Sequence, residues 1–313
     1  MMILFRRLWL VPFLLLLLAS GLQGAAQPNA PTQTPRPTPS STGGRVECGV
    51  LPSKLLARSV RFCAVLPPSY DAHPQQRFPV LYWLHGLGEN EQSFSGQSGL
   101  AMLDALRSRG QTGEFLMITP DGGRSFYLNS RDGRRPYEDF FMREFLPAME
   151  RRFRIEATRA TRGISGVSMG GFGALHFGLK YPETFGSISA HSAALMEEPP
   201  QAMLDGARTG FLDEVFGYPV DRGYWERNGV FYLARHAARN SGWKIYFDCG
   251  REDDFGFDEG NQALHKLLKS RGIPHEFHLD PGRHGWEYFA KHIPASLEFH
   301  AKAFREAQEA AGR

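Results

Sequence analysis

The chain has 313 residues, of which 42% are hydrophobic and 22% are charged. This ordinary globular composition excludes disorder throughout and leaves room for one large domain or two smaller ones. The 36 basic side chains nearly balance the 33 acidic ones, and the formal net charge is +3. Because no basic run and no aromatic-interleaved basic stripe is present, the sequence gives no electrostatic basis for binding nucleic acid.

Residues 1–26 have the pattern of a secretory signal peptide. Arg6 and Arg7 form a short basic start, residues 8–18 are almost wholly apolar, and Gly24, Ala25 and Ala26 are the small residues of a cleavage site. We therefore expect a secreted or periplasmic mature chain that begins near residue 27 and makes no stable membrane insertion. An uncleaved anchor is the alternative, but the apolar run is shorter than the roughly 20 residues of a spanning helix.

A change in composition follows the predicted signal. Residues 27–44 are rich in Pro, Thr, Gln and Ser and lack apolar periodicity, which predicts a linker that cannot bury a core. Residues 45–313 show no internal repeat and no second pattern. They are therefore predicted to form one domain.

The predicted domain begins with a hairpin. Residues 45–50 and 59–66 are strand-like, with a turn near residues 52–54, and in that register Cys48 faces Cys63. In an exported protein we expect these two cysteines to form a disulfide, with two free thiols as the alternative. Cys249 is then left over inside an apolar run, and we expect a buried small side chain rather than a nucleophile.

After the hairpin, short apolar segments alternate with longer segments of helical spacing. This alternation predicts an α/β fold, with a mostly parallel central sheet covered by helices on both faces. The least patterned stretch, residues 191–240, is where a lid or an acyl-site insertion is expected. The predicted strands are residues 78–84, 115–119, 163–167, 185–189, 244–249 and 275–279, and the predicted helices are residues 99–109, 137–153, 169–180 and 262–270.

A Gly-X-Ser-X-Gly pentapeptide lies where a predicted strand runs into a predicted helix, with Ser168 between Gly166 and Gly170. A nucleophilic serine at such a turn has strained backbone angles, and flanking glycines let neighbouring elements pass closely. The pentapeptide alone is common, but the strand before it and the helix after it supply the required context. We predict that Ser168 is a nucleophile; a structural serine at a Gly-rich helix start is the alternative.

A serine hydroxyl needs a base, and in this strand–turn–helix arrangement an acid and then a histidine follow the serine along the chain. Asp253 and Asp254 come just after the strand predicted at 244–249, so either of them could be the acid. His284 lies in a turn-rich loop before the closing helix and is the predicted base.

The tetrahedral intermediate of acyl transfer needs two backbone donors. One N–H belongs to the residue after the nucleophile and the other to the loop after an early strand, which predicts Met169 and Leu87. His85 directly precedes Gly86 of that loop, and we expect a packing and hydrogen-bonding residue at the edge of the substrate pocket rather than a catalytic one.

Together these motifs resemble the carbohydrate esterase and S-formylglutathione hydrolase group of α/β-hydrolases, which is related to feruloyl and acetyl xylan esterases and to mycolyltransferases. The resemblance implies the α/β-hydrolase fold and a serine esterase acting on short-chain or polysaccharide-linked esters without a cofactor. It favours Asp253 as the acid, because the family's acid falls three residues after the glycine that ends its Asp-Cys-Gly strand. The segments that carry it are residues 66–70, 85–86, 120–123, 166–171, 249–253 and 282–286.

The resemblance also gives candidates for the substrate pocket. Tyr127 and Asn129, followed by Glu138 and Asp139, come after the Pro-Asp-Gly-Gly loop at residues 120–123. In the resembling enzymes such residues shape the acyl or leaving-group side of the cleft; helix capping and surface solvation are the alternatives. Trp286 either covers the pocket or seats the last helix.

No metal site is expected. His275 and His278 are three residues apart on a predicted strand and would point to opposite faces, and the acidic residues 253–259 do not match a calcium loop. Two other functions remain open. A sugar hydroxyl could replace water and make the enzyme an acyltransferase, or the same scaffold could be a catalytically silent glycan-binding module.

Overall fold

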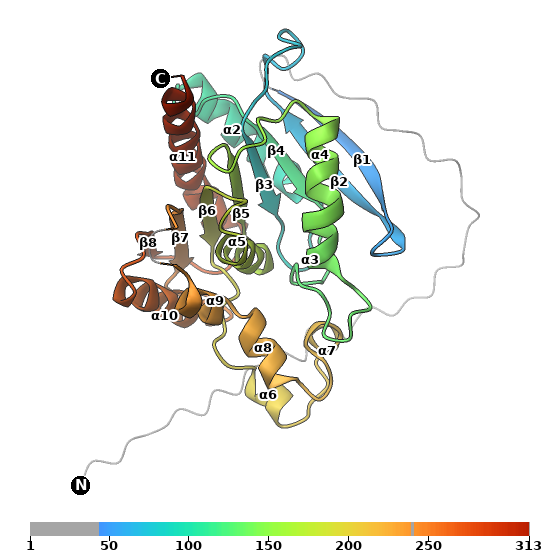
Figure 1. Ribbon diagram of the computed structural model, residues 1–313. Coiled ribbons are helices and arrows are strands. Elements are labelled where there is room, and N and C mark those ends of the chain that lie inside the picture. Colours follow the sequence, from blue (N-terminus) through green and yellow to red (C-terminus); the bar gives the residue numbers. More distant parts are fainter. Residues whose placement is uncertain (1–43, 239–240, 313) are drawn as a thin grey trace. The chain divides into compact units, whose positions relative to one another are not determined.

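The computed structural model describes residues 44–238 and 241–312. The predicted signal peptide and all but the last residue of the predicted linker lie outside these ranges. In the described part, an eight-stranded sheet has the order β1-β2-β4-β3-β5-β6-β7-β8 (Figure 1). The strands are β1 (Arg45–Ser53), β2 (Arg58–Leu66), β3 (Val80–Leu84), β4 (Leu116–Pro120), β5 (Arg162–Gly166), β6 (Ser187–His191), β7 (Lys244–Gly250) and β8 (Glu276–Asp280).

Strand pairing is mostly parallel. The pairs β1–β2 and β2–β4 are antiparallel, and every other neighbouring pair from β4 to β8 is parallel. Helices connect the parallel strands, and a last helix, α11 (Trp286–Ala311), follows β8. The connecting helices are α1 (Ser93–Gly96), α2 (Gly99–Ser108), α3 (Tyr137–Phe140), the π-helical turn η1 (Phe141–Phe145), α4 (Leu146–Arg152), α5 (Met169–Lys180), α6 (Gln201–Leu204), α7 (Phe211–Phe216), α8 (Arg222–Asn228), α9 (Val230–His236) and α10 (Phe257–Ser270). The predicted α/β fold class is confirmed.

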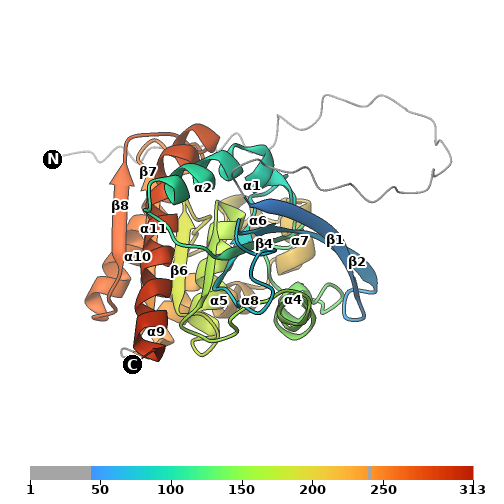
Figure 2. The same cartoon turned by 90° about the horizontal axis from the view of Figure 1, so that it is seen from above.

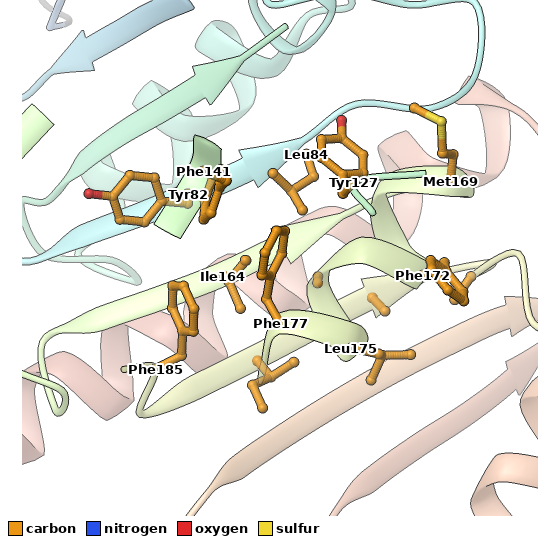
Figure 3. Packing of buried hydrophobic residues seen from close by; sticks show 14 of the residues in the cluster. Tyr82, Leu84, Tyr127, Phe141, Ile164, Met169, Phe172, Leu175, Phe177 and Phe185 are labelled. Atoms are coloured by element: carbon orange, nitrogen blue, oxygen red, sulfur yellow. The ribbon is translucent and has the colours of Figure 1, made fainter. Parts of the chain in front are cut away.

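Two hydrophobic cores lie on opposite faces of the sheet, because successive strand side chains point to opposite sides. In β3, Tyr82 and Leu84 pack with α4 and α5, whereas Leu81 and Trp83 pack with α2 and α11. Figure 2 shows α2 on one side of the sheet and α4 and α5 on the other. Figure 3 shows part of the first core, where β3 and β5 meet the apolar side chains of α5.

The N-terminal hairpin has the predicted register. Cys48 pairs with Cys63, and the two form a disulfide, which confirms that prediction. The turn itself lies later than predicted, since pairing continues to Ser53 and Arg58. The third cysteine, Cys249, is a fully buried free thiol in β7, as expected, and its burial raises the pKa of the thiol.

The predicted helix at residues 137–153 is interrupted. The π-helical turn η1 separates α3 from α4, and Pro147 lies in the first turn of α4. Proline has no N–H to donate to the carbonyl group four residues earlier, so the regular ladder breaks just before it. The largest other differences in limits are at three elements: β3 begins at Val80 rather than at residue 78, β6 spans Ser187–His191 rather than residues 185–189, and α10 begins at Phe257 rather than at residue 262.

The stretch predicted as a lid or an acyl-site insertion folds into four helices, α6 to α9, between β6 and β7. Figure 1 shows α6, α7 and α8 beyond the carboxyl ends of the central strands. There α7 meets the loop that follows β4: Arg131 N–H donates to the Val215 carbonyl, and the rings of Phe126 and Phe216 lie edge to face. Within residues 44–238 and 241–312, no helix combines the length and apolarity needed to cross a membrane.

Candidate active site

Ser168 lies in the sharp turn between β5 and α5. Its backbone has φ of 54° and ψ of −117°, a strained combination for a residue with a Cβ. Two contacts hold this turn: Ser168 N–H donates to the His191 carbonyl at 2.9 Å, and Ala194 N–H donates to the Ser168 carbonyl at 3.0 Å. The side chain of Ser168 is half-buried, so its hydroxyl group is positioned by the backbone and still accessible.

The two glycines of the pentapeptide are required by close backbone contacts. A Cβ on Gly170 would lie 2.0 Å from the Leu84 carbonyl oxygen, and a Cβ on Gly166 would lie 2.5 Å from the Gly170 carbonyl oxygen. Without these side chains, the start of α5 packs directly against the end of β3. The positive end of the α5 dipole therefore lies beside Ser168.

His284 and Asp253 are hydrogen-bonded on loops at the carboxyl ends of β8 and β7. The distance from His284 Nδ1 to Asp253 Oδ2 is 2.7 Å, and the Asp253 side chain is fully buried. The other carboxylate oxygen accepts the N–H groups of Phe255 at 3.0 Å and Phe257 at 3.4 Å. With Nδ1 bound to the carboxylate, Nε2 of the imidazole remains available for proton transfer.

Asp254 has a different role in this structure. Its carboxylate accepts the backbone N–H of His284 at 3.3 Å and forms an ion pair with Arg283. The structure therefore brings Asp253, and not Asp254, to the His284 ring. Three aromatic rings also surround the imidazole edge to face, at centroid distances of 4.8 Å for Phe255, 5.5 Å for Phe257 and 5.4 Å for Phe289.

Residues 86–89, just after β3, form a tight turn beside the serine. Glu89 N–H donates to the Gly86 carbonyl at 3.2 Å, and Gly88 in the third position has φ of 84°, as a type II turn requires. The internal hydrogen bond of such a turn does not use the N–H of its second residue, Leu87. A Cβ on Gly86 would lie 3.6 Å from Ser168 Cβ, which places the turn against the serine.

The second predicted donor is the N–H of Met169, the first residue of α5. The first N–H groups of a helix have no partner within the helix, so this group can bind an anion. Leu87 and Met169 thus come from two different elements that meet at Ser168. Beside them, His85 is buried, with Nε2 accepting Gly122 N–H at 2.8 Å and Nδ1 2.8 Å from the Gly86 carbonyl oxygen.

The model of the Putative esterase family matches residues 53–300. The chain belongs to this family. Curated relatives include an acetyl esterase from Caldicellulosiruptor saccharolyticus, 30% identical over 266 residues that cover 80% of this chain and 96% of the relative. A Mycobacterium tuberculosis protein named an esterase is 32% identical over 244 residues, 70% of this chain and 51% of that protein.

Solved structures agree with the family assignment. A ferulic acid esterase superimposes with a TM-score of 0.73 at 25% identity, covering 84% of this chain and all of that one. An S-formylglutathione hydrolase from Agrobacterium tumefaciens has the same fold, with a TM-score of 0.70 at 20% identity, covering 86% of this chain and 98% of that one. The chain is thus an α/β-hydrolase and a serine ester hydrolase, and both predictions are confirmed.

The pocket candidates of this esterase occupy different surroundings. Tyr127 is fully buried beneath the turn at 86–89, and its hydroxyl group donates to the His85 carbonyl at 3.0 Å. The Asn129 side chain accepts Asp139 N–H at 3.0 Å and so caps the start of α3. Trp286 is half-buried, and its Nε1–H donates to Glu89.

Glu138 of the esterase, also placed near the cleft by the sequence, is buried among hydrogen-bond donors. His176, Lys180 and Tyr181 all contact its carboxylate. Burial alone raises the pKa of this group, but the hydrogen bonds outweigh burial and lower the pKa to about 2. Glu138 therefore ties α3 to α5 as a carboxylate.

A second Asp-His-Ser set lies inside the esterase. His191 Nδ1 is 2.7 Å from Asp248 Oδ2, and His191 Nε2 is 2.8 Å from Ser296 Oγ. All three side chains are fully buried between the sheet and α11, so this set is structural. His191 ends β6, and its carbonyl group supports the Ser168 turn.

The histidine pattern near β8 does not gather ligands for a metal. His275 Nε2 contacts His265 Nδ1 at 2.8 Å, whereas His278 lies 2.8 Å from Glu276. In the part of the chain that the structure describes, no group of three or more His, Cys, Asp or Glu side chains could hold a metal ion.

Proposed function

We propose that Ser168, His284 and Asp253 catalyse two-step acyl transfer to water. Ser168 Oγ attacks the ester carbonyl carbon while His284 Nε2 takes the hydroxyl proton, and His284 then returns that proton to the leaving alcohol. A water molecule attacks the acyl-enzyme in the same manner and releases the acid and the free serine. Asp253 fixes the imidazole, and the N–H groups of Leu87 and Met169 bind the oxyanion.

One observation carries this proposal. The imidazole of His284 is bound at 2.7 Å to a buried carboxylate, on a loop at the same end of the sheet as the strained turn of Ser168. A buried carboxylate keeps the proton on Nδ1 and stabilises the imidazolium that forms when the serine loses its proton. A surface histidine without such a partner would have neither advantage.

The substrates that we propose are short-chain esters and O-acyl groups on carbohydrates, hydrolysed without a cofactor. Support comes from the relative named acetyl esterase and from the structural neighbour named ferulic acid esterase. We further propose a secreted or periplasmic enzyme with a signal peptide (1–26), a linker (27–44) and one catalytic domain (45–313). The disulfide supports an oxidising location, and N-terminal sequencing of the exported protein tests the cleavage site.

The test is the initial rate of p-nitrophenyl acetate hydrolysis by wild type and by Ser168→Ala. Loss of the nucleophile is expected to lower kcat by about 10⁴-fold or more. Ser270→Ala is the matched control, because Ser270 is an exposed serine at the end of α10. Equal turnover by wild type and Ser168→Ala would refute Ser168 as the nucleophile, and no turnover by either would refute the proposal and favour a glycan-binding scaffold.

Product analysis separates hydrolysis from transfer. The acyl-enzyme reacts with whichever hydroxyl group reaches the carbonyl carbon first, so a bound sugar could compete with water at the second step. With acetyl-xylan fragments or feruloyl esters as donors and free sugar as acceptor, we expect mainly the free acid. An excess of acylated sugar would instead identify an acyltransferase.

A further inference from the structure

Glu89 has a set of contacts that the proposed mechanism does not use. Its backbone N–H closes the turn onto the Gly86 carbonyl at 3.2 Å. Its side chain then reaches back, and Oε2 accepts the Gly86 N–H at 2.8 Å. The same residue therefore ties both polar groups of the Gly86 backbone. Since Leu87 lies between these two residues, Glu89 fixes the direction of the Leu87 N–H.

The second oxygen of this carboxylate holds a different part of the chain. Glu89 Oε1 accepts the Nε1–H of Trp286 at 2.5 Å. Trp286 is two residues after His284 and begins α11. Its ring lies edge to face with Phe289 at 5.9 Å, and Phe289 lies edge to face with His284 at 5.4 Å. One carboxylate thus bridges the turn at 86–89 and the segment that carries the histidine.

We propose that Glu89 is a positioning residue, which keeps the oxyanion-binding turn and the His284 segment in register. This inference rests on the proposed function. A carboxylate suits the position because both partners, Gly86 N–H and Trp286 Nε1–H, are donors, and a carboxylate has two acceptor oxygens and no donor. A glutamine has only one acceptor oxygen, so its amide nitrogen would face one of the two N–H groups.

The bridge should affect the transition state more than the bound substrate. The Leu87 N–H interacts most strongly with the oxyanion, which exists only while the carbonyl carbon is tetrahedral. Removal of a whole oxyanion donor costs about 10²- to 10³-fold in kcat. Misalignment of one donor is a smaller defect, so we expect about a 10- to 100-fold loss of kcat for Glu89→Gln, with KM changed less than threefold.

The experiment compares Glu89→Gln, Trp286→Phe and the double variant in the full-length mature enzyme. Trp286→Phe keeps an aromatic ring but removes the N–H that Glu89 binds. If the bridge acts as one unit, the double variant should lose no more kcat than the worse single variant. The affinity for a boronic acid, which forms a tetrahedral adduct with the serine, should fall in parallel with kcat.

Glu144→Gln is the matched control. Its carboxylate also accepts backbone N–H groups in a tight turn, those of Lys54 at 3.1 Å and Leu55 at 3.3 Å, between β1 and β2. We expect Glu144→Gln to lower the melting temperature without changing kcat. If Glu89→Gln does not fold, Trp286→Phe and its boronic acid affinity still test the bridge.

Three results would overturn the inference: wild-type kcat in Glu89→Gln, losses that multiply in the double variant, or a loss confined to KM. Failure of the proposed function looks different. In that case the wild type itself has no turnover, or Ser168→Ala keeps it, whatever residue 89 is.

Discussion

Gly170→Ala separates two opposite expectations for the turn at Ser168. Gly170 lies in the first turn of α5, where helix propensity alone predicts that alanine stabilises by about 1 kcal/mol. The added Cβ, however, would lie 2.0 Å from the Leu84 carbonyl oxygen and 2.8 Å from the His85 carbonyl oxygen. To reach an ordinary contact of 3.4 Å, α5 and β3 must separate by about 1.4 Å.

This separation sets the expected magnitudes. Overpacking of a close-packed interior costs about 1–3 kcal/mol, so we expect Gly170→Ala to lower the free energy of unfolding by about 2 kcal/mol. A displacement of about 1 Å in a catalytic group costs roughly 10²-fold in rate, so kcat for p-nitrophenyl acetate should fall at least that far. Ser168 moves with α5 and Leu87 with β3, so the two groups move apart.

Urea unfolding and initial rates measure both effects. Gly96→Ala is the control, since Gly96 ends α1, has no left-handed backbone and would place its Cβ in open space. It is expected to change the free energy of unfolding by less than about 0.5 kcal/mol. If Gly170→Ala kept wild-type stability and full kcat, this would falsify the argument that close backbone contact requires a glycine at position 170.

Three further predictions follow from single contacts. Asp253→Asn should lower kcat by about 10³- to 10⁴-fold, because it alters the group bound to His284 Nδ1, whereas Asp254→Asn should lower kcat less than tenfold in the same assay. Replacing both Cys48 and Cys63 by Ser opens a loop of 15 residues and should lower the free energy of unfolding by about 3 kcal/mol; a loss below 1 kcal/mol in urea would contradict this. Burial lowers the pKa of His300 to about 3, so below pH 6.5 the unfolded chain binds a proton that the folded chain does not. As the pH is lowered from 6 to 4, the free energy of unfolding should therefore decrease by about 1 kcal/mol per pH unit more in wild type than in His300→Gln. Equal dependence of the free energy of unfolding on pH in the two proteins would refute the lowered pKa of His300.

The layered fold could be predicted because the strands are short and apolar and the helices between them are long. Periodicity also explains why the two cores separate, with Tyr82 and Leu84 on one face of β3 and Leu81 and Trp83 on the other. Where the structure differs from the predicted helix at residues 137–153, the chemistry of one residue is the cause. Pro147 broke a helix that apolar spacing alone extended without interruption, because the missing N–H of proline is not a property of hydrophobic spacing.

The candidate site was predictable to the extent that its residues lie in local motifs. Ser168 is set by its own strand and helix, and His284 by its loop. The choice between Asp253 and Asp254 needed a family resemblance, since both follow the same strand and their distances along the chain to His284 differ by only one residue. The roles of Asn129 and Glu89 depend on which loops meet in space, and neither residue belongs to a repeating pattern.

Burial is the property that a sequence pattern predicts least well. The set of Asp253, His284 and Ser168 and the set of Asp248, His191 and Ser296 illustrate this. Asp253 and Asp248 each lie 2.7 Å from a histidine Nδ1, and His191, Asp248 and Ser296 even follow an order along the chain that is known from serine proteases. Ser296 cannot act as a nucleophile, however, because its hydroxyl group is fully buried and donates to the Ile293 carbonyl at 3.0 Å. Ser168 is half-buried in the turn that follows β5, whereas Ser296 lies on the buried face of α11 against His191, the last residue of β6. Exposure therefore separates the proposed catalytic serine from the structural one, and exposure comes from the position of each residue in the layers and not from the residue types or their spacing.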